Sequence, residues 1–374
     1  MLTSLRLNPD LLKVPRYTAG RSIAEVQEHY GLTDVVKMAS NENALGASPL
    51  AVEAARQALA EAHLYPGTAD RDLRRRIAQS VDQGLDERHV ILGNGATDLI
   101  RMLAQAFVFG GGEMLTASVT FPMYFVSTSL AGGVSVRAPL TPDMALDLDA
   151  MAERIGPETR LCYVCSPNNP TGLTVRKAEF DAFLARVPEH VVVVIDESYR
   201  GFVEDDDPPD PWPHILAGRN LIVLRTFSKL SGLANLRVGY AFSTPEIIDY
   251  LARAQMPFHV NTPSLAAAMA SLDDDEFHAN SRAHVLQERK FLGQALTALG
   301  IRWLPSQANF MLLTHLPLDA EGCFEALLRR GIIVRPMGGW GVPNAIRVSL
   351  GTRRDNLRFL AALREMLDGV RPRD

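Results

Sequence analysis

The sequence predicts an α/β protein with a mostly parallel sheet, joined to a smaller α+β unit. Strand and helix signals alternate along most of the chain, as in a parallel sheet covered by helices. Residues 191–195 form a continuous β-branched run, which is typical of a strand buried on both faces. From about residue 245, long helical patterns and short strands take over. A chain of 374 residues is long enough for about two domains.

The composition argues against two kinds of partner. Hydrophobic residues make up 47% of the chain and charged residues 22%, as in ordinary globular proteins. The net charge of −5 provides no basic surface for nucleic acid or anionic lipid. The longest β-branched apolar run is far shorter than a membrane span, and the first residues lack the pattern of a secretory signal. We therefore expect no nucleic-acid or membrane partner.

Two early helices carry capping signals. Ser22 and Glu25 have the spacing of a capping box, and Gly31 is expected to end that helix. Ser48 precedes Pro49, which suits the first position of the next helix. The other elements expected before residue 85 are a strand at 35–38, a turn at 65–67 and a charged helix at 72–81.

The first clear strand–loop–helix unit spans residues 89–109. Its strand at 89–92 leads through Gly93-Asn-Gly95 into a helix at 99–109, and such glycines leave backbone N–H groups free for an anion. Further elements of this region are strands at 114–117, 134–136, 159–165, 190–195 and 221–224, and helices at 126–130 and 180–186. The C-terminal unit is expected to have helices at 246–253, 264–271, 275–299, 323–330 and 356–367, with strands at 301–303, 310–313, 332–334 and 346–349.

Cys162 and Cys165 form a C-x-x-C pattern, which can indicate a redox or zinc site. They lie in a predicted strand, however, where positions three apart point to opposite faces. No second Cys or His pair has metal spacing, so we expect buried thiols and no metal. Unpaired cysteines also fit a reducing cytoplasm.

Polar residues follow four of the predicted strands. In a parallel sheet, ligands bind at these carboxyl ends. Lys229 has apolar neighbours, which should lower its pKa and favour the neutral amine needed for a Schiff base. A buried Asp196 needs a cationic partner, and a protonated pyridine nitrogen would be one. Together with the Gly95-Ala96-Thr97 turn, Asn169 and the aromatic Tyr124, the set predicts pyridoxal 5′-phosphate, although each residue alone is an ordinary strand end.

From about Arg16 to Leu367, the chain resembles the class I/II pyridoxal-phosphate-dependent aminotransferases, and within them the histidinol-phosphate aminotransferase subfamily. The motifs that carry the resemblance are Ser166-Pro-Asn-Asn-Pro-Thr-Gly172, Asp196-Glu-Ser-Tyr199, and Ser228-Lys229 with Arg237 eight residues on. The resemblance implies the aspartate-aminotransferase-like fold (fold type I). A large, mostly parallel seven-stranded α/β/α domain would span 41–262, a small α+β domain 263–374, and an arm at 1–40 would join the small domain. It also implies a homodimer with shared active sites.

The resemblance also assigns roles to residues. Lys229 would bind the cofactor and move the substrate proton, and Asp196 would hold the pyridinium N–H. Asn169 and Tyr199 would bind the ring oxygen, and Tyr124 would stack on the ring. The residues expected at the phosphate are Gly95, Ala96, Thr97, Thr226, Ser228 and Arg237, with Tyr65 reaching the partner subunit's phosphate. Those expected at the substrate are Tyr17, Asn43, Asn309, Arg335 and Arg347.

The resemblance favours transamination between imidazole-acetol phosphate and glutamate, giving histidinol phosphate and 2-oxoglutarate. An aromatic amino-acid aminotransferase and a pyridoxal-phosphate-dependent decarboxylase of a phosphorylated amino acid remain alternatives. A non-catalytic effector-binding module is a rival from another class, but the chain keeps Lys229 and has no added DNA-binding segment. A nicotinamide dehydrogenase fits the sequence less well, because Gly93-Asn-Gly95 lacks the third glycine of the dinucleotide motif.

Overall fold

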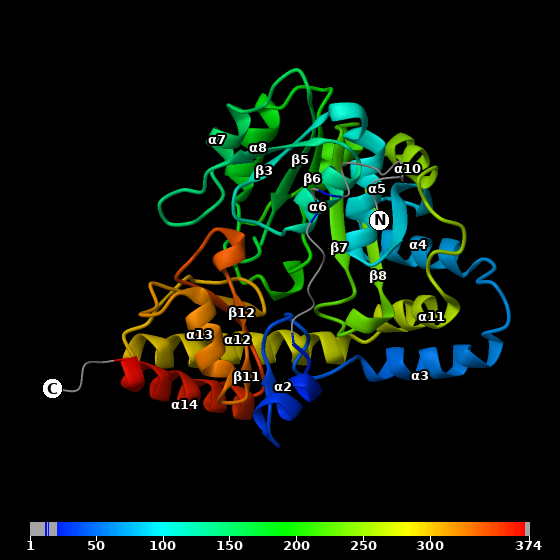
Figure 1. Ribbon diagram of the computed structural model, residues 1–374. Coiled ribbons are helices and arrows are strands. Elements are labelled where there is room, and N and C mark those ends of the chain that lie inside the picture. Colours follow the sequence, from blue (N-terminus) through cyan, green and yellow to red (C-terminus); the bar gives the residue numbers. More distant parts are fainter. Residues whose placement is uncertain (1–11, 13, 15–20, 371–374) are drawn as a thin grey trace, which may run out of the picture.

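A seven-stranded sheet forms the centre of the larger domain (Figure 1). The computed structural model describes residues 12, 14 and 21–370. The sheet order is β2-β8-β7-β6-β5-β3-β4, and β8 is antiparallel to both of its neighbours, whereas the other pairings are parallel. In that order the strands are Val90–Asn94, Val238–Phe242, Leu221–Thr226, Val192–Asp196, Thr159–Cys165, Glu113–Ala117 and Val134–Ala138. The predicted large, mostly parallel seven-stranded domain is confirmed.

Helices cover both faces of this sheet, and side-chain alternation along β6 divides its core in two. Val193 and Ile195 pack into one apolar cluster, whereas Val192 and Val194 pack into the other. Helices contributing to the first cluster are α3 (Pro49–Ala58), α4 (Ala69–Gln79), α7 (Leu148–Ala152), α8 (Lys177–Arg186), α9 (Trp212–Leu216) and α11 (Thr262–Ser271). Those contributing to the second are α5 (Ala96–Phe107), α6 (Met123–Leu130) and α10 (Pro245–Ala252).

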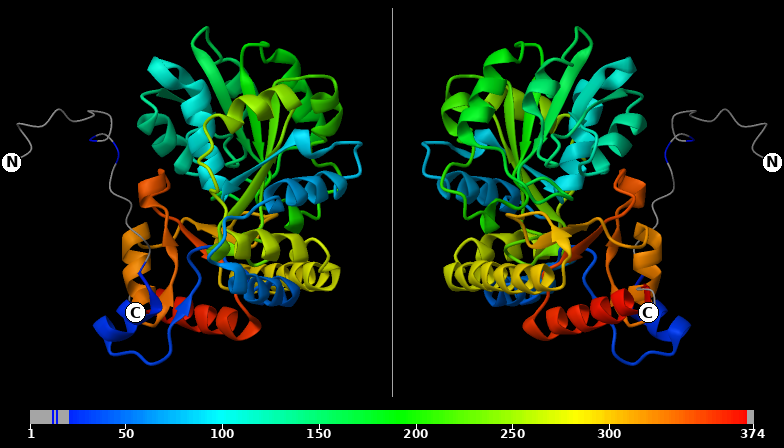
Figure 2. Two further views of the ribbon diagram at one scale, coloured as in Figure 1. Left: turned by 90° about the vertical axis from the view of Figure 1, so that its right-hand side faces the viewer. Right: turned by 90° about the vertical axis from the view of Figure 1, so that its left-hand side faces the viewer.

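The smaller domain has a four-stranded sheet in the order β12-β13-β10-β9. These strands are Arg335–Pro336, Ile346–Ser349, Phe310–Thr314 and Arg302–Trp303. Helices α12 (Asp275–Ala298), α13 (Ala320–Leu328) and α14 (Arg353–Val370) accompany it. Near the N-terminus, β1 (Val36–Lys37) pairs in parallel with β11 (Ile332–Ile333). The N-terminal helix α2 (Ile23–Tyr30) therefore lies beside the C-terminal elements, as both views in Figure 2 show.

The cap of α2 follows from the sequence as predicted. Ser22 Oγ accepts from the Glu25 amide at 3.2 Å, and the Glu25 carboxylate accepts from the Ser22 amide at 2.6 Å. Gly31 ends the helix in the left-handed region with φ 66°. Several predicted boundaries differ by a few residues, and α5 begins at Ala96, three residues before its expected start.

Helix α11 bears on the boundary between the domains. Leu265, Ala267 and Ala268 pack into the same core as the large sheet, although they follow the boundary expected at residue 262. We propose a division about a dozen residues later, near the start of α12 at Asp275.

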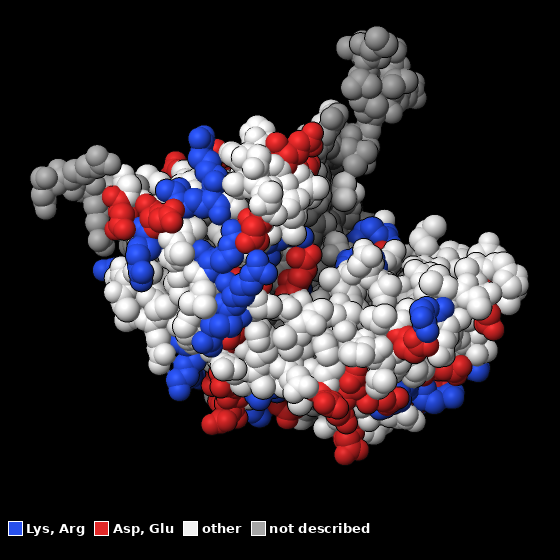
Figure 3. Space-filling view, turned by 90° about the horizontal axis from the view of Figure 1, so that it is seen from below, with Lys and Arg blue, Asp and Glu red and all other residues white. Residues whose placement is uncertain are grey.

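The described surface carries both kinds of charge. Basic side chains gather on the face seen in Figure 3, with acidic side chains beside them. Arg354 and Arg358 both pair with Asp34, at 3.2 and 2.8 Å. Within residues 12, 14 and 21–370, no helix has the length and apolar character required to span a membrane.

Candidate active site

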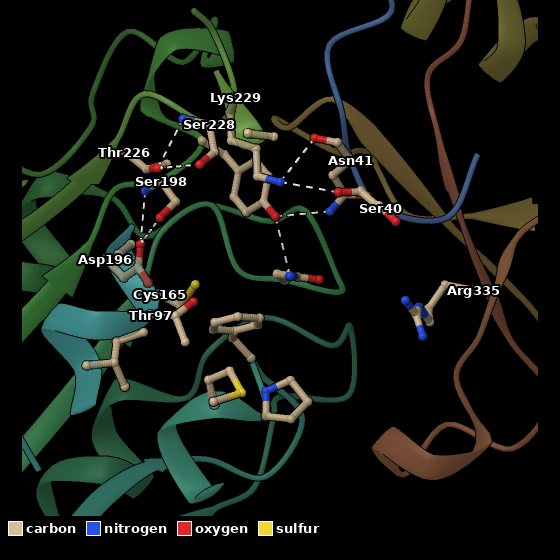
Figure 4. Close-up of a pocket in the computed structure, with 18 of the residues that line it drawn as sticks. Ser40, Asn41, Thr97, Cys165, Asp196, Ser198, Thr226, Ser228, Lys229 and Arg335 are labelled. Carbon is tan, nitrogen blue, oxygen red and sulfur yellow. Dashed lines mark hydrogen bonds between the residues drawn. The ribbon is translucent and has the colours of Figure 1, made fainter. Parts of the chain in front are cut away.

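A cavity of about 710 Å³ lies where the carboxyl ends of the parallel strands face the small domain. Its walls include Asp196 and Lys229 from the large domain and Arg335 from the small one (Figure 4). Arg237 and Arg347 also line it. Parallel strands bring their carboxyl ends to one edge, which is why residues far apart in sequence converge there.

Lys229 lies three residues past the end of β7 and points into this cavity (Figure 4). Its Nζ donates to the backbone oxygens of Asn41 at 3.1 Å and Ser40 at 3.3 Å. Burial, followed by the nearby positive charge of Arg347, lowers the pKa of the amine to about 7. The predicted lowering is confirmed, and a substantial fraction of the amine is neutral at pH 7.

Asp196 is the last residue of β6 and is 3% exposed. Its carboxylate accepts from Tyr124 Oη at 2.6 Å and from both Oγ and N of Ser198, at 2.6 and 2.9 Å. Burial raises the pKa of this carboxyl group. Among the described residues no Lys, Arg or His forms an ion pair with it, so its charge is held by neutral donors alone. Ser198 was not predicted, although an Asp-x-Ser sequence after a strand is a known turn pattern.

The N-terminus of α5 and the loops after β7 form one corner of the cavity. Gly95 caps α5 at φ 77°, and a Cβ at this position would overlap the guanidinium group of Arg237. Thr226 Oγ1 accepts from the Ser228 amide at 3.1 Å and lies 3.0 Å from Ser228 Oγ. Ala96, Thr97, Thr226, Ser228 and Arg237 all line the cavity, so the structure brings this predicted set together. Free amides, hydroxyls and a guanidinium group suit a phosphate.

A chain of hydrogen bonds connects Tyr199 to Arg347. Asn169 Nδ2 donates to Tyr199 Oη at 3.4 Å, and Asn169 Oδ1 accepts from Arg347 Nη1 at 2.6 Å. Arg347 Nη2 donates to the Ala39 oxygen at 2.7 Å, whereas its buried Nε has no partner among the described residues. An unpartnered buried N–H beside a cavity is a free donor for an anionic ligand.

Aromatic rings and a second arginine surround Arg347. Its guanidinium group lies 5.3 Å from the ring centre of Phe310 and 5.6 Å from that of Trp340. Burial lowers the pKa of Arg347 to about 10, and the charge of Arg335 acts in the same direction. Arg335 faces Arg347 across the β12–β13 pairing and also lines the cavity. Trp340 lines the cavity as well.

The structure does not support the role expected for Tyr124. Its ring is fully buried and stacks on Tyr163 with centres 4.1 Å apart, whereas its hydroxyl group bonds Asp196. It therefore supports Asp196 and does not face the cavity. Phe121, from the loop after β3, lines the cavity in its place and was missed by the sequence analysis.

Asn43 also differs from expectation. Its Nδ2 donates to the Leu230 oxygen at 2.9 Å and to Ser281 Oγ at 3.0 Å, and its Oδ1 accepts from the Leu45 amide. These bonds hold the loop that follows Lys229. Asn43 itself does not line the cavity. The residues of this segment that do line it are Ala39, Ser40, Asn41 and Glu42.

Asn309 and Tyr65, two further predicted residues, do not line the cavity. Asn309 is buried and does not line the cavity; its Nδ2 donates to the Asn41 oxygen at 3.1 Å and its Oδ1 is unpartnered within the described chain. Tyr65 is 76% exposed and stacks on Phe258, so it is not part of this subunit's cavity. Tyr17 lies outside the described residues.

The residues present fit pyridoxal 5′-phosphate. The unpaired carboxylate of Asp196 suits a protonated pyridine nitrogen, and the corner at Gly95 and Arg237 suits a phosphate. The amine of Lys229 suits an aldehyde. These three features involve different residues, and they match three different parts of one molecule: its ring nitrogen, its phosphate and its aldehyde.

The fold and this cavity together define an enzyme of the pyridoxal-phosphate type, with a buried lysine at the edge of a parallel sheet. Residues 33–363 match the family model for class I and II aminotransferases, and the chain belongs to that family. It is 42% identical, over 96% of its length and 98% of the relative, to the histidinol-phosphate aminotransferase of Anaeromyxobacter sp. (strain Fw109-5). The corresponding protein of Moorella thermoacetica is 40% identical, with 96% and 92% covered.

The fold has solved counterparts. The histidinol-phosphate aminotransferase from Sinorhizobium meliloti, in complex with pyridoxal 5′-phosphate, superposes with a TM-score of 0.89 at 26% identity. That match covers 99% of this chain and 100% of the other. A Thermus thermophilus aspartate aminotransferase variant gives a TM-score of 0.85 at 24% identity, with 98% and 99% covered, which supports the fold alone. The expected fold type I is therefore confirmed.

Proposed function

We propose that this chain transfers an amino group between histidinol phosphate and 2-oxoglutarate, with pyridoxal 5′-phosphate as its cofactor. The observation that carries the chemistry is a single cavity holding the amine of Lys229, with a pKa of about 7, and the unpaired buried carboxylate of Asp196. The substrate choice is supported by the names of relatives that are 40–42% identical over 96% of the chain.

When bound, pyridoxal 5′-phosphate supplies an aldehyde that combines with amines and a ring that accepts negative charge. Lys229 would hold the cofactor through that aldehyde, and its amine would carry the proton to and from the substrate Cα. Asp196 keeps the ring nitrogen protonated, which lets the ring accept charge. Tyr124 and Ser198 orient Asp196 by donating to its two oxygens.

Two arginines would allow one subsite to bind the different anionic groups of the two substrates. Glutamate presents an α-carboxylate where histidinol phosphate presents a phosphate, so one subsite must accept each anion in turn. Arg347, with its free Nε, suits the carboxylate, and the addition of Arg335 suits the more highly charged phosphate. We propose Tyr17 as a further phosphate contact.

We further propose that the protein is a cytoplasmic homodimer with shared active sites. Support for the dimer is the exposed apolar segment around Tyr65, where Leu59 and Leu64 are also exposed. The three cysteines are buried free thiols, which fits a reducing compartment.

The proposed function is tested by incubating the purified holoenzyme with histidinol phosphate and 2-oxoglutarate, and separately with phenylalanine and 2-oxoglutarate. We expect glutamate from the first pair at a kcat/KM at least about 100-fold above that of the second, because only the first can use both arginines. The reverse preference would indicate an aromatic aminotransferase. A third incubation, with a phosphorylated amino acid that carries an α-carboxylate, such as phosphothreonine, tests the other alternative. Release of carbon dioxide from it without glutamate would indicate a decarboxylase.

A further inference from the structure

We propose that Asn41 is a positioning residue that fixes the Tyr199 hydroxyl group and the Lys229 amine where the two domains meet. The chemical meaning of this inference rests on the proposed function, in which both groups serve the cofactor. Asn41 follows β1 and lines the cavity, with bonds directed toward both groups (Figure 4).

Every polar atom of Asn41 has a partner. Its amide donates to Ser349 Oγ at 2.7 Å, and its Oδ1 accepts from the same hydroxyl group at 2.9 Å. Its Nδ2 donates to Tyr199 Oη at 3.0 Å. Its backbone oxygen accepts from Lys229 Nζ and from Asn309 Nδ2, both at 3.1 Å. Because Asn41 is 1% exposed, water does not readily replace these bonds.

These partners belong to different domains. Ser349 lies on β13 of the small domain, two residues after Arg347, whereas Tyr199 follows β6 of the large domain. Asn41 therefore connects the strand that carries Arg347 to the Tyr199 hydroxyl group. The other connection, through Asn169, reaches that hydroxyl group at 3.4 Å, so Asn41 is its closer donor.

The backbone of Asn41 restricts which residues can replace it. Its φ is 55°, in the left-handed region that Asn, Asp and Gly tolerate and most other residues avoid. Asp keeps the size of the side chain and removes the Nδ2 donor, and Gly removes the whole side chain. Both substitutions therefore test the side chain without imposing backbone strain.

Loss of the Nδ2 donor should weaken Tyr199 as a donor to the cofactor. Burial raises the pKa of Tyr199 to about 12, and the bond from Asn41 opposes that rise. A neighbouring carboxylate at position 41 would also favour the protonated amine of Lys229. The charged or titratable groups that already face Lys229 or Tyr199 are Arg347, Arg237, Glu42, Asp196 and Cys165.

The first test follows the absorbance band of the pyridoxal-phosphate-loaded protein against pH, without substrate. We expect Asn41→Asp to raise the midpoint of this pH-dependent absorbance change by at least about half a pH unit. That is the expected effect of one lost hydrogen bond together with one added negative charge. Asn41→Gly should raise it less, and so should Ser349→Ala, which frees the Asn41 side chain. Ser243→Ala is the matched control, because Ser243 is fully buried and bonds the Leu221 oxygen where β7 begins. It should lower the melting temperature and leave the midpoint unchanged.

The second test uses cofactor-free protein and measures acylation of Lys229 at pH 7 by mass spectrometry. Asn41→Asp should slow it about threefold to tenfold, since less of the amine is neutral. Unchanged midpoints and acylation rates in folded Asn41→Asp and Asn41→Gly proteins would overturn the proposal. If Asn41→Asp does not fold, Asn41→Gly and Ser349→Ala decide. Neither test uses histidinol phosphate. If that compound proves not to be the substrate, the absorbance and acylation measurements on the Asn41 variants would still be valid.

Discussion

The Lys229 amine has a measurable consequence before any substrate binds. With a pKa of about 7, most of it should already be neutral by about pH 8. Capture of pyridoxal 5′-phosphate by cofactor-free protein, trapped with borohydride, should therefore accelerate about tenfold per pH unit below pH 6 and level off above about pH 8. A rate that keeps rising to pH 10 would mean that Lys229 behaves as an ordinary exposed lysine. Lys290, which is exposed on α12, is the internal comparison.

Asp196 should oppose folding until the cofactor is present. Its folded pKa is raised by burial, so the charged form costs stability above the unfolded pKa, and this cost disappears in acid where both states are protonated. Asp196→Asn should raise the melting temperature of cofactor-free protein by a few degrees at pH 8 and not near pH 4. In the loaded enzyme, the same change should lower kcat at least about 100-fold. Asp249→Asn is the control, because Asp249 lies on an exposed part of α10. An equal rise in melting temperature for this variant at pH 8 would show that burial of Asp196 is not the cause.

At this scale the sequence identified residue types better than side-chain directions. Lys229 and Asp196 were predictable because each follows an apolar strand whose end must face the ligand edge. Tyr124 and Asn43 were assigned to the cofactor and substrate, yet tertiary contacts turn both away from the cavity. One hydroxyl group or amide has several possible partners, and only the packing of distant segments selects among them.

The N-terminal turn of α5 depends on a glycine for two separate reasons. Gly95 has φ 77°, and a Cβ there would overlap Arg237. Gly95→Ala should therefore destabilise the fold by about 2 kcal/mol and weaken pyridoxal-phosphate affinity at least about tenfold. Gly218→Ala is the matched control, with φ 79° and nothing within 4 Å of its Cβ. It should show a smaller loss of stability and unchanged affinity; equal losses of affinity would indicate that the overlap with Arg237 is unimportant.

Strand β8 shows what local patterns miss at the scale of elements. The six parallel strands of the large sheet were predicted from apolar runs, but Val238–Phe242 was not. It contains Gly239, whose missing Cβ allows the strand to approach the backbone of Ala96. A glycine weakens a strand signal even where close approach requires it. The resemblance to a known family supplied the seventh strand that periodicity did not.

At the scale of the molecule, helix α11 shows why a border between domains is hard to place from a sequence pattern. Helix α11 carries a pattern like those of the small domain's helices, but it packs under the large sheet. Its partner α3 lies more than 200 residues earlier in sequence, and a one-dimensional pattern contains no information about that contact.

The largest consequence of the proposed dimer is that neither subunit alone would hold a complete site. Tyr65 is 76% exposed and outside its own cavity, so any role in binding a phosphate requires a second subunit. Tyr65→Ala and Lys229→Ala should each be nearly inactive. Mixing them equally, with subunit exchange, should restore about a quarter of wild-type activity, because half of the two-fold dimers then contain one intact site. The control uses Tyr250→Ala in place of Tyr65→Ala, because Tyr250 is also an exposed tyrosine and lies on α10. The Tyr250→Ala protein should have normal activity without mixing. If the Tyr65→Ala and Lys229→Ala mixture forms mixed dimers by mass spectrometry but stays inactive, Tyr65 does not serve the partner's site.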